Sequence, residues 1–311
     1  MTFKKHIQSI FVAFIIIFNG CAEGEWELLE VDYEPVLNVF GLISLDPEVE
    51  SFVRVYRTTN LSEESEIFVG IDTIRFSDPK NNNEDTWWID SLFEPAAIIK
   101  DAQVSIKANG TSIPFNFVPK QYSWEYEKNV YLDTLGTFTP QPGTTYLLDV
   151  TVPGYDSVKG QLLTPGIPVL IDTLIQDTVS TKRTYKIVWQ QLNGGKGYLS
   201  GRLEGWSIAF EFECNPDFDR VVDLQEGTYT VPVRICEQRQ TEPGEPEPFI
   251  IRLMTMDENY YEYFIRGEEG GYNNFLLNSG TTAGRSVGIE GGLGVFGSVA
   301  SVKVQRVIIQ Y

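Results

Sequence analysis

The chain has 311 residues, of which 42% are hydrophobic and 22% charged, so it can build a packed core and is not disordered throughout. Its 24 basic and 43 acidic residues give a formal net charge of −19, which argues against a nucleic-acid partner because phosphate binding needs a basic surface. The one histidine is His6, so Ser-His-Asp and Cys-His nucleophiles are not expected.

The first residues have the pattern of a bacterial lipoprotein signal peptide. Lys4 and Lys5 precede an apolar run at 10–18, and Cys21 follows it. A helix over this run would rise only about 14 Å, too short for a hydrocarbon core of about 30 Å. The end of the run resembles a lipobox, although Phe18 stands where leucine is commonest. We predict a signal peptide at 1–20 and a diacylglycerol and acyl lipid on Cys21; an ordinary signal peptide is the alternative.

Residues 21–30 form an acidic stretch directly after that cysteine. Such a stretch resembles the surface-export signal of Bacteroidota lipoproteins, although a plain solvated tether explains it nearly as well. The expected location is therefore the outer membrane, with a lipid anchor and with exposure at the cell surface as the further expectation.

Apolar residues alternate with polar ones over most of the remaining chain, which is typical of half-buried β-strands. A clear case is 102–117, where Asn109-Gly110 separates two alternating runs and predicts a hairpin. Further runs lie at 36–43, 52–56, 146–162, 185–189, 206–214, 229–235, 249–256 and 299–309. The sequence therefore predicts an all-β chain of two antiparallel, immunoglobulin-like β-sandwiches.

One short helix is expected after Asp257, which can cap it, because Tyr260, Tyr261 and Phe264 recur at helical spacing. Two prolines and a glycine at 165–168 mark the boundary between the two sandwiches, which we place at 31–165 and 169–311. The glycines at 291–297 lack the helix and acidic residue of a dinucleotide site, so they predict tight turns and close backbone approach.

Cys214 and Cys236 are the cysteines that remain beyond Cys21. A disulfide between them suits an exported protein. Cys236, however, is out of phase with the apolar face of its own run, so two separate thiols stay open as the alternative.

Three acidic residues, Asp217, Asp219 and Asp223, form a weak calcium candidate, because an Asp-x-Asp pair can direct two oxygens toward one ion. A solvated acidic loop is the favoured interpretation, and no other metal site or cofactor is expected.

Among the aromatic residues, Trp87 and Trp88 are notable because strand alternation would turn one of the two rings outward. Trp124 gives a weaker case of the same kind. An outward ring could face a glycan or a peptide ligand; the favoured alternative is that these rings cover the edges of the core.

Several segments, in this order, resemble the DUF4249 family, the domain-of-unknown-function 4249 lipoproteins of Bacteroidota. They are the opening at 35–59, the strand at 99–106, the hairpin at 138–165, the aromatic run at 260–263 and the glycine-rich run at 291–297. The resemblance covers most of 21–305 but is weak over about 170–245. The hairpin of the first domain is also similar to those of transthyretin-like sandwiches.

The resemblance implies an outer-membrane lipoprotein, often encoded beside a TonB-dependent transporter, and assigns no catalytic residue. We therefore expect a non-enzymatic surface lipoprotein that is an accessory or ligand-capture partner of such a transporter. A glycan-binding or adhesive surface module is the alternative. A carboxylate-dependent hydrolase is the remaining enzymatic hypothesis, and no pair of acidic residues is singled out for it.

Overall fold

The computed structural model describes residues 34–60, 63–77, 85–119, 129–193, 195–204, 216–233, 246–266 and 286–309. The chain divides into two units, 1–34 and 35–311, and the fold described here is that of the second unit. This unit consists mostly of β-strands with one short helix, so the all-β prediction is confirmed.

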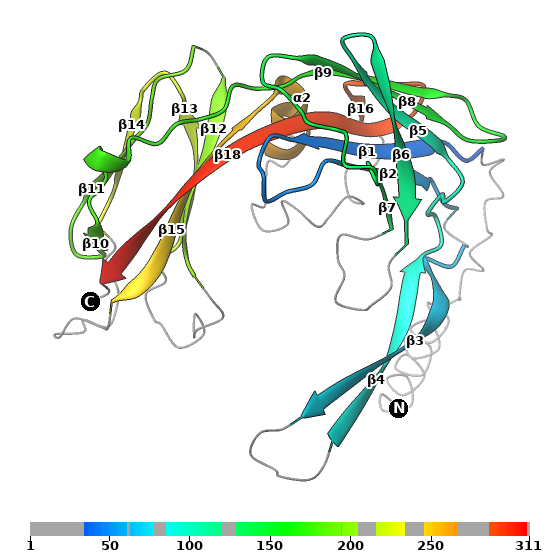
Figure 1. Cartoon of the computed structure of the whole chain (residues 1–311), viewed down its shortest axis with the longest axis horizontal. Coiled ribbons are helices and arrows are strands. Elements are labelled where there is room, and N and C mark those ends of the chain that lie inside the picture. Colours follow the sequence, from blue (N-terminus) through cyan, green and yellow to red (C-terminus); the bar gives the residue numbers. More distant parts are fainter. Residues whose placement is uncertain are drawn as a thin grey trace, which may run out of the picture. The chain divides into compact units, whose positions relative to one another are not determined.

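A curled, 14-stranded sheet forms the body of the unit within the described ranges (Figure 1). Its strands follow each other in the order β13 (Phe218–Asp223), β12 (Lys196–Leu203), β15 (Glu247–Met256), β18 (Leu293–Ile309), β1 (Leu37–Ser44), β2 (Phe52–Arg57), β7 (Val130–Leu132), β6 (Thr111–Val118), β5 (Gln103–Ala108), β8 (Thr145–Thr151), β9 (Val158–Leu163) and β17 (Ile289–Glu290). Two short strands, β10 (Thr178–Ser180) and β16 (Ser286–Val287), also pair with β18.

The turn residues of the predicted hairpins adopt the conformations that their sequence requires. Asn109 and Gly110 both have positive φ angles, 51° and 81°, as a tight two-residue hairpin turn demands, and they connect β5 to β6. Gly154, with φ of 85°, lies in the turn between β8 and β9. Both predicted hairpins are therefore confirmed.

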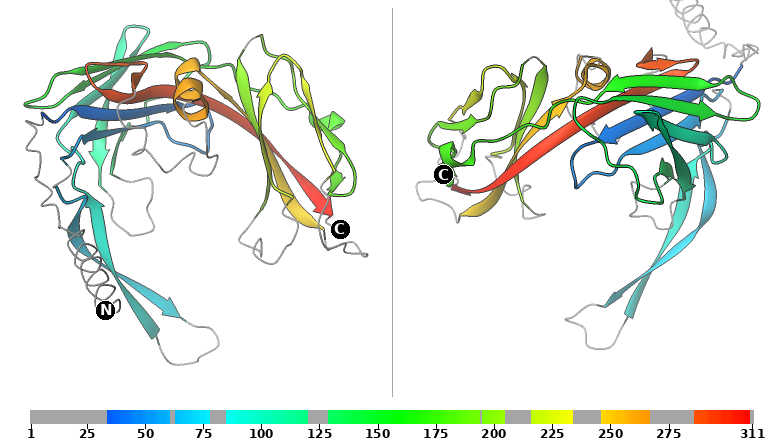
Figure 2. Two further views of the ribbon diagram at one scale, coloured as in Figure 1. Left: turned by 180° about the vertical axis from the view of Figure 1, so that it is seen from behind. Right: turned by 45° about the horizontal axis from the view of Figure 1, so that its top comes forward.

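Strand β18 runs through both halves of the unit, as Figure 2 shows from two further sides. Its first part, from Leu293 to Val299, pairs in parallel with β1. Its second part, from Val299 to Ile308, pairs antiparallel with β15. The two separate sandwiches expected from the sequence are not confirmed, because one strand joins both halves into a continuous sheet.

Two hydrophobic cores nevertheless lie on either side of the predicted boundary. The first contains residues from Leu37 to Leu162, and the second contains residues from Leu170 to Leu253 together with Ile308. Ile289 and Phe296 belong to the first core, although the predicted limits placed them in the second domain. The chain therefore returns to its first half before it ends.

In the second core, the main sheet packs against a separate two-stranded sheet of β11 (Tyr185–Val188) and β14 (Thr228–Val231). The short 3-10 helix η1 (Asp172–Leu174) precedes these strands. Trp189, which follows β11, is buried and donates its ring N–H to the carbonyl of Leu224 at 3.1 Å.

The predicted helix consists of α2 (Glu258–Tyr260) and a turn of π-helix, η2 (Tyr261–Ile265). Asp257 caps it, as expected, by accepting a hydrogen bond from the Tyr260 amide at 3.0 Å. Tyr260 packs with Leu42, Met256 and Val299 in a third, smaller core. The helix therefore covers the sheet where the two halves meet.

Strands β3 (Glu66–Ser77) and β4 (Asp85–Pro95) pair only with each other in the described part of the chain and form a second two-stranded sheet. The register shifts between Phe68 and Gly70, which marks a β-bulge. The sequence did not predict β3, because the bulge and Asp72 interrupt its alternation of apolar residues.

Candidate functional site

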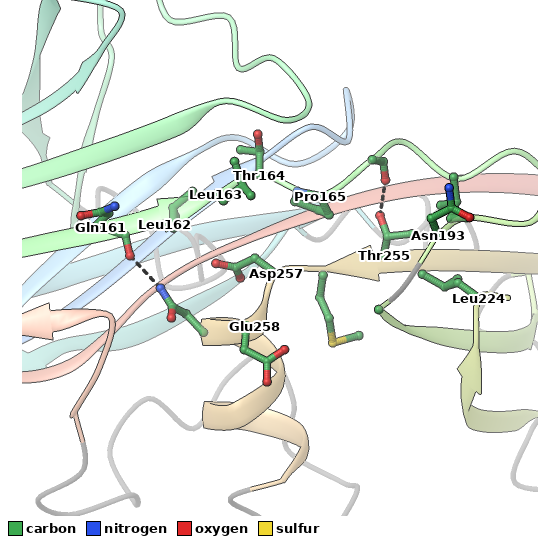
Figure 3. Close-up of a pocket in the computed structure, with 15 residues that line it drawn as sticks. Gln161, Leu162, Leu163, Thr164, Pro165, Asn193, Leu224, Thr255, Asp257 and Glu258 are labelled. Carbon is green, nitrogen blue, oxygen red and sulfur yellow. Dashed lines mark hydrogen bonds between the residues drawn. The ribbon is translucent and has the colours of Figure 1, made fainter.

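A cavity of about 650 Å³ lies where the end of β9 meets the start of α2 (Figure 3). Four parts of the chain line it: the segment 161–166, the residues Leu192, Asn193 and Gly195, Leu224, and the segment 255–259 that leads from β15 into α2. The predicted boundary segment at 165–168 therefore forms one wall of the cavity. The cavity has the volume of a small-molecule site.

Two side chains, Thr255 and Asn259, fix the walls of this cavity to each other by hydrogen bonds. Thr255, at the end of β15, donates its hydroxyl to the Gly166 carbonyl at 2.6 Å. Asn259, in α2, donates its side-chain N–H to the Gln161 carbonyl at 2.8 Å and to the Phe296 carbonyl at 2.9 Å. These hydrogen bonds hold the strand, the helix and the boundary segment together around the cavity. Figure 3 draws the bond from Thr255 to the Gly166 carbonyl and the bond from Asn259 to the Gln161 carbonyl.

Asp257 is the buried ionisable group of the cavity, with 7% of its surface exposed. Its Oδ1 accepts the Ser298 amide at 2.8 Å as well as the Tyr260 amide. Burial is the main cause that raises the pKa of Asp257, which reaches about 7, and the nearby negative charge of Glu258 also raises it. The two hydrogen bonds act in the opposite direction and lower this pKa. A carboxyl group in this setting changes its charge near neutral pH.

The hydroxyl groups of the two threonines that line the cavity are already engaged. Thr164 lines it, but its hydroxyl already donates to the Gln141 carbonyl at 2.6 Å, and that of Thr255 is engaged with Gly166. The described lining combines apolar side chains, the side-chain amides of Gln161, Asn193 and Asn259, and a single buried carboxyl group. This arrangement can hold a ligand that has both an apolar part and a polar end.

A second feature is the apolar face of the hairpin β3–β4. Phe68, Ile71, Ile89 and Phe93 are exposed to 57%, 63%, 73% and 49%. The register places Phe68 opposite Phe93, and their rings meet edge to face at 5.8 Å. Ile71 lies opposite Ser91 and Ile89 opposite Thr73 on the same face. We call these four side chains the hairpin face.

The three acidic residues of the calcium candidate are held by basic side chains. Arg202 lies 2.5 Å from Asp219 and 4.0 Å from Asp217, and Lys196 lies 3.3 Å from Asp223. Asp219 and Asp223 lie in strand β13, where four residues of extended chain separate them by about 13 Å, too far to share one ion. The described residues contain no group of three potential metal ligands, and Asp219 and Asp223 lie in a strand and not in a loop.

The other predicted site residues fall largely outside the described part of the chain. Cys21, Trp124, Cys214 and Cys236 lie outside the described residues, as do the predicted signal peptide and tether. Trp87 and Trp88 lie in β4, opposite Arg75 and Ile74, but their side chains are not among those described. Their roles stay predictions.

Sequence reasoning identified Asp257 as a helix cap but did not identify the cavity beside it. The sequence holds no signal for it, because the closeness of residues 165 and 257 arises only in the fold. The hairpin face could have been found from Ile67-Phe68-Val69 and Ile71, a dense apolar run flanked by acidic residues.

A search of the curated proteins found no match for this chain. In the described ranges, none of the helices has the length and apolar character needed to cross a membrane. The family model described as "Domain of unknown function (DUF4249)" matches residues 27–305, which is most of the chain and includes the first core, the hairpin and the residues that line the cavity. The chain therefore belongs to the DUF4249 family.

Proposed function

We propose that this protein is a non-enzymatic lipoprotein, anchored at the outer membrane through a lipid on Cys21 and exposed at the cell surface. In this proposal it is an accessory or ligand-capture partner of a TonB-dependent transporter. The protein carries this lipid as a covalent modification and needs no cofactor. The observation that carries the proposal is the exposed hairpin face.

Exposed apolar side chains that gather on one face mark a binding surface more often than a free one. Each of the four side chains of the hairpin face leaves 49% or more of its surface in water. A partner that covered them would gain hydrophobic free energy of about 25 cal/mol for each Å² buried. Such a face therefore supports a protein whose working state is an assembly.

The charge of the chain supports a protein partner over a lipid surface. With a formal net charge of −19, the chain is repelled by anionic lipid headgroups. Asp90, which is exposed, follows Ile89 directly in β4. A partner with an apolar groove and basic residues at its rim fits this combination.

The architecture of the two cores is also proposed to be sandwich-like. In the first half, a Cβ added to Gly41 on β1 would lie 3.5 Å from Leu148 on β8, so these two parts of the curled sheet face each other. In the second half, β11 and β14 cover the main sheet. This supports an immunoglobulin-like or transthyretin-like arrangement around each core.

The proposal is tested by gentle solubilisation of native outer membranes that contain the protein with a C-terminal tag. We expect one TonB-dependent transporter to co-purify at comparable abundance, and the lipidated Cys21 to appear in the mass of the N-terminal peptide. Absence of the protein from purified outer membranes, or its recovery without a transporter, would contradict the proposal.

The alternative is a glycan-binding or adhesive module. It is favoured by the position of Trp87 and Trp88 in β4, on the hairpin that also carries the exposed face. Binding on a glycan array that Trp87→Ala abolishes would favour this alternative. A disulfide between Cys214 and Cys236 stays a separate prediction, which peptide mass mapping without reductant would test.

A further inference from the structure

We propose that the cavity beside Asp257 binds a small ligand that carries a protonated amine on a short apolar body. The ammonium group pairs with the Asp257 carboxylate, and the apolar body lies against the leucine and methionine side chains of the walls. The inference concerns a site other than the hairpin face and does not rest on the proposed function.

The dimensions and the walls of the cavity suit such a ligand. Its volume of about 650 Å³ lies within the range of about 300–1,000 Å³ that small-molecule sites occupy. Its apolar walls come from different parts of the chain, with Leu162 from β9, Leu192 from the turn after β11, Leu224 after β13 and Met256 from β15. These walls can cover an aliphatic body but cannot pair with a charge.

Asp257 supplies the polar end of the site. The hydrogen bonds that the structure gives to its side chain, from Ser298 and Tyr260, both end on Oδ1. No donor from another described residue reaches Oδ2, and the residue lines the cavity. Figure 3 shows the carboxyl group between the end of β9 and the start of α2, with Glu258 beside it. A donor from a ligand would therefore complete its hydrogen bonding.

The charges around Asp257 select a cation. Glu258 and Tyr260 are the titratable groups that act on it from its own helix, and Ser298 faces it from β18. Among the described residues that line the cavity, Asp257 and Glu258 are the ionisable ones, and both are acidic. A buried carboxylate without a cation is costly, and Asp257 avoids that cost by holding a proton up to about pH 7; a positively charged ligand would stabilise its ionised form instead.

An organic cation fits the site better than a metal ion. The described residues contain no group of three carboxylates, thiols or imidazoles that could hold a metal. Calcium takes six to eight oxygen ligands, whereas an ammonium group needs only one carboxylate and nearby acceptors. An arriving ammonium group would favour the ionised form of Asp257 and so lower its raised pKa.

The first test uses the unaltered full chain in mild detergent and isothermal titration calorimetry. Hexylamine and hexan-1-ol have the same apolar body and differ in the charged end. We expect hexylamine to bind one to one and at least ten times more tightly than hexan-1-ol. Because Asp257 ionises near pH 7, the affinity for hexylamine should rise about tenfold from pH 6 to pH 8. Equal affinities for the two compounds, or no binding of hexylamine, would overturn the proposal.

The second test changes the carboxyl group. Asparagine is also a good helix cap, so Asp257→Asn keeps the acceptor for Ser298 and Tyr260 and should preserve the fold, which circular dichroism checks. The variant should bind hexylamine at least ten times more weakly and without the pH dependence. The matched control is Asp149→Asn, a carboxyl group that pairs with Lys107 at 2.8 Å and does not line the cavity. Unchanged binding by Asp257→Asn would contradict the proposal; if that variant does not fold, the first test decides alone.

Free alkylamines and the amino termini of peptides share this chemistry. At pH 7, leucyl-leucine amide and its N-acetyl derivative separate the two sources. Tighter binding of the free dipeptide amide than of hexylamine would assign the site to peptide amino termini. The opposite order would assign it to alkylamines, and in both cases acetylation should abolish binding. An acetylated dipeptide that binds as well as the free one would overturn the role of the amine.

Discussion

Asp257 shows how much of the architecture depends on one side chain. Its carboxyl group accepts the amides of Tyr260 and Ser298, and its own amide donates to the Ser298 carbonyl at 3.0 Å. These three hydrogen bonds tie the end of β15, the start of α2 and strand β18 together. Because the same group is buried, the fold carries a titratable site at this junction.

The raised pKa of Asp257 predicts how stability depends on pH. Because the folded state holds the proton more tightly than the unfolded state, Asp257 contributes stability that is fully present below about pH 4 and is lost as the pH rises through about 7. Asparagine does not titrate, so Asp257→Asn should not lose this stability as the pH rises. At pH 8 the free energy of unfolding of the variant should therefore exceed that of the unaltered protein by an amount on the order of 2–4 kcal/mol. Urea unfolding at pH 5 and pH 8 measures it. Parallel pH profiles for the two proteins would refute the prediction.

At the scale of the element, β18 is the strand that joins the two halves of the fold, because it pairs with both β1 and β15. The sequence predicted a last strand at 299–309, but β18 begins at Leu293. Its glycines allow close approach, as predicted: a Cβ on Gly294, where φ is 112°, would lie 2.0 Å from the Val39 carbonyl oxygen of β1. Glycine is therefore needed for β18 to pair with β1.

Replacing Gly294 should accordingly uncouple these two strands. Gly294→Ala combines a positive φ with a clash against backbone, and we expect a loss of stability of about 2–4 kcal/mol. The control is Gly70→Ala in β3, where a Cβ would meet only Leu92 at 3.9 Å, and here the change should stay within about 0.5 kcal/mol. Chemical unfolding of both variants measures the difference. Equal losses would show that the close approach at Gly294 does not matter.

The hairpins and the helix cap could be predicted because their signals are local. Asn109-Gly110 fixes a turn within two residues, and Asp257 caps a helix within three. Strand β3 was missed because a bulge breaks its period, and the sharing of β18 was missed because strand pairing joins residues far apart in the chain. The cavity was missed for the same reason, since its walls come from four distant segments.

At the scale of the whole molecule, the continuous sheet has a consequence for unfolding. Two independent sandwiches would lose their structure in two steps. Here β18 contributes Phe296 to the first core and Ile308 to the second, so neither core is complete without it. The two halves should therefore unfold together.

We expect one cooperative transition in calorimetry. Leu148→Ala in the first core and Leu199→Ala in the second should each lower the midpoint of that same transition, because each removes a side chain at most 2% exposed and costs about 2–5 kcal/mol. A thermogram with two peaks, of which each variant shifts only one, would contradict a shared core strand.

The measurement that tests the central claim most directly compares two surface variants in the co-purification from outer membranes. Ile89 on the hairpin face and Leu135 in the turn after β7 have nearly equal exposure, 73% and 72%, so aspartate at either position should leave the fold intact. If the hairpin face docks to a transporter, Ile89→Asp should reduce the recovered transporter by about tenfold or more, whereas Leu135→Asp should recover it fully. Full recovery by Ile89→Asp would show that the hairpin face is not the docking surface.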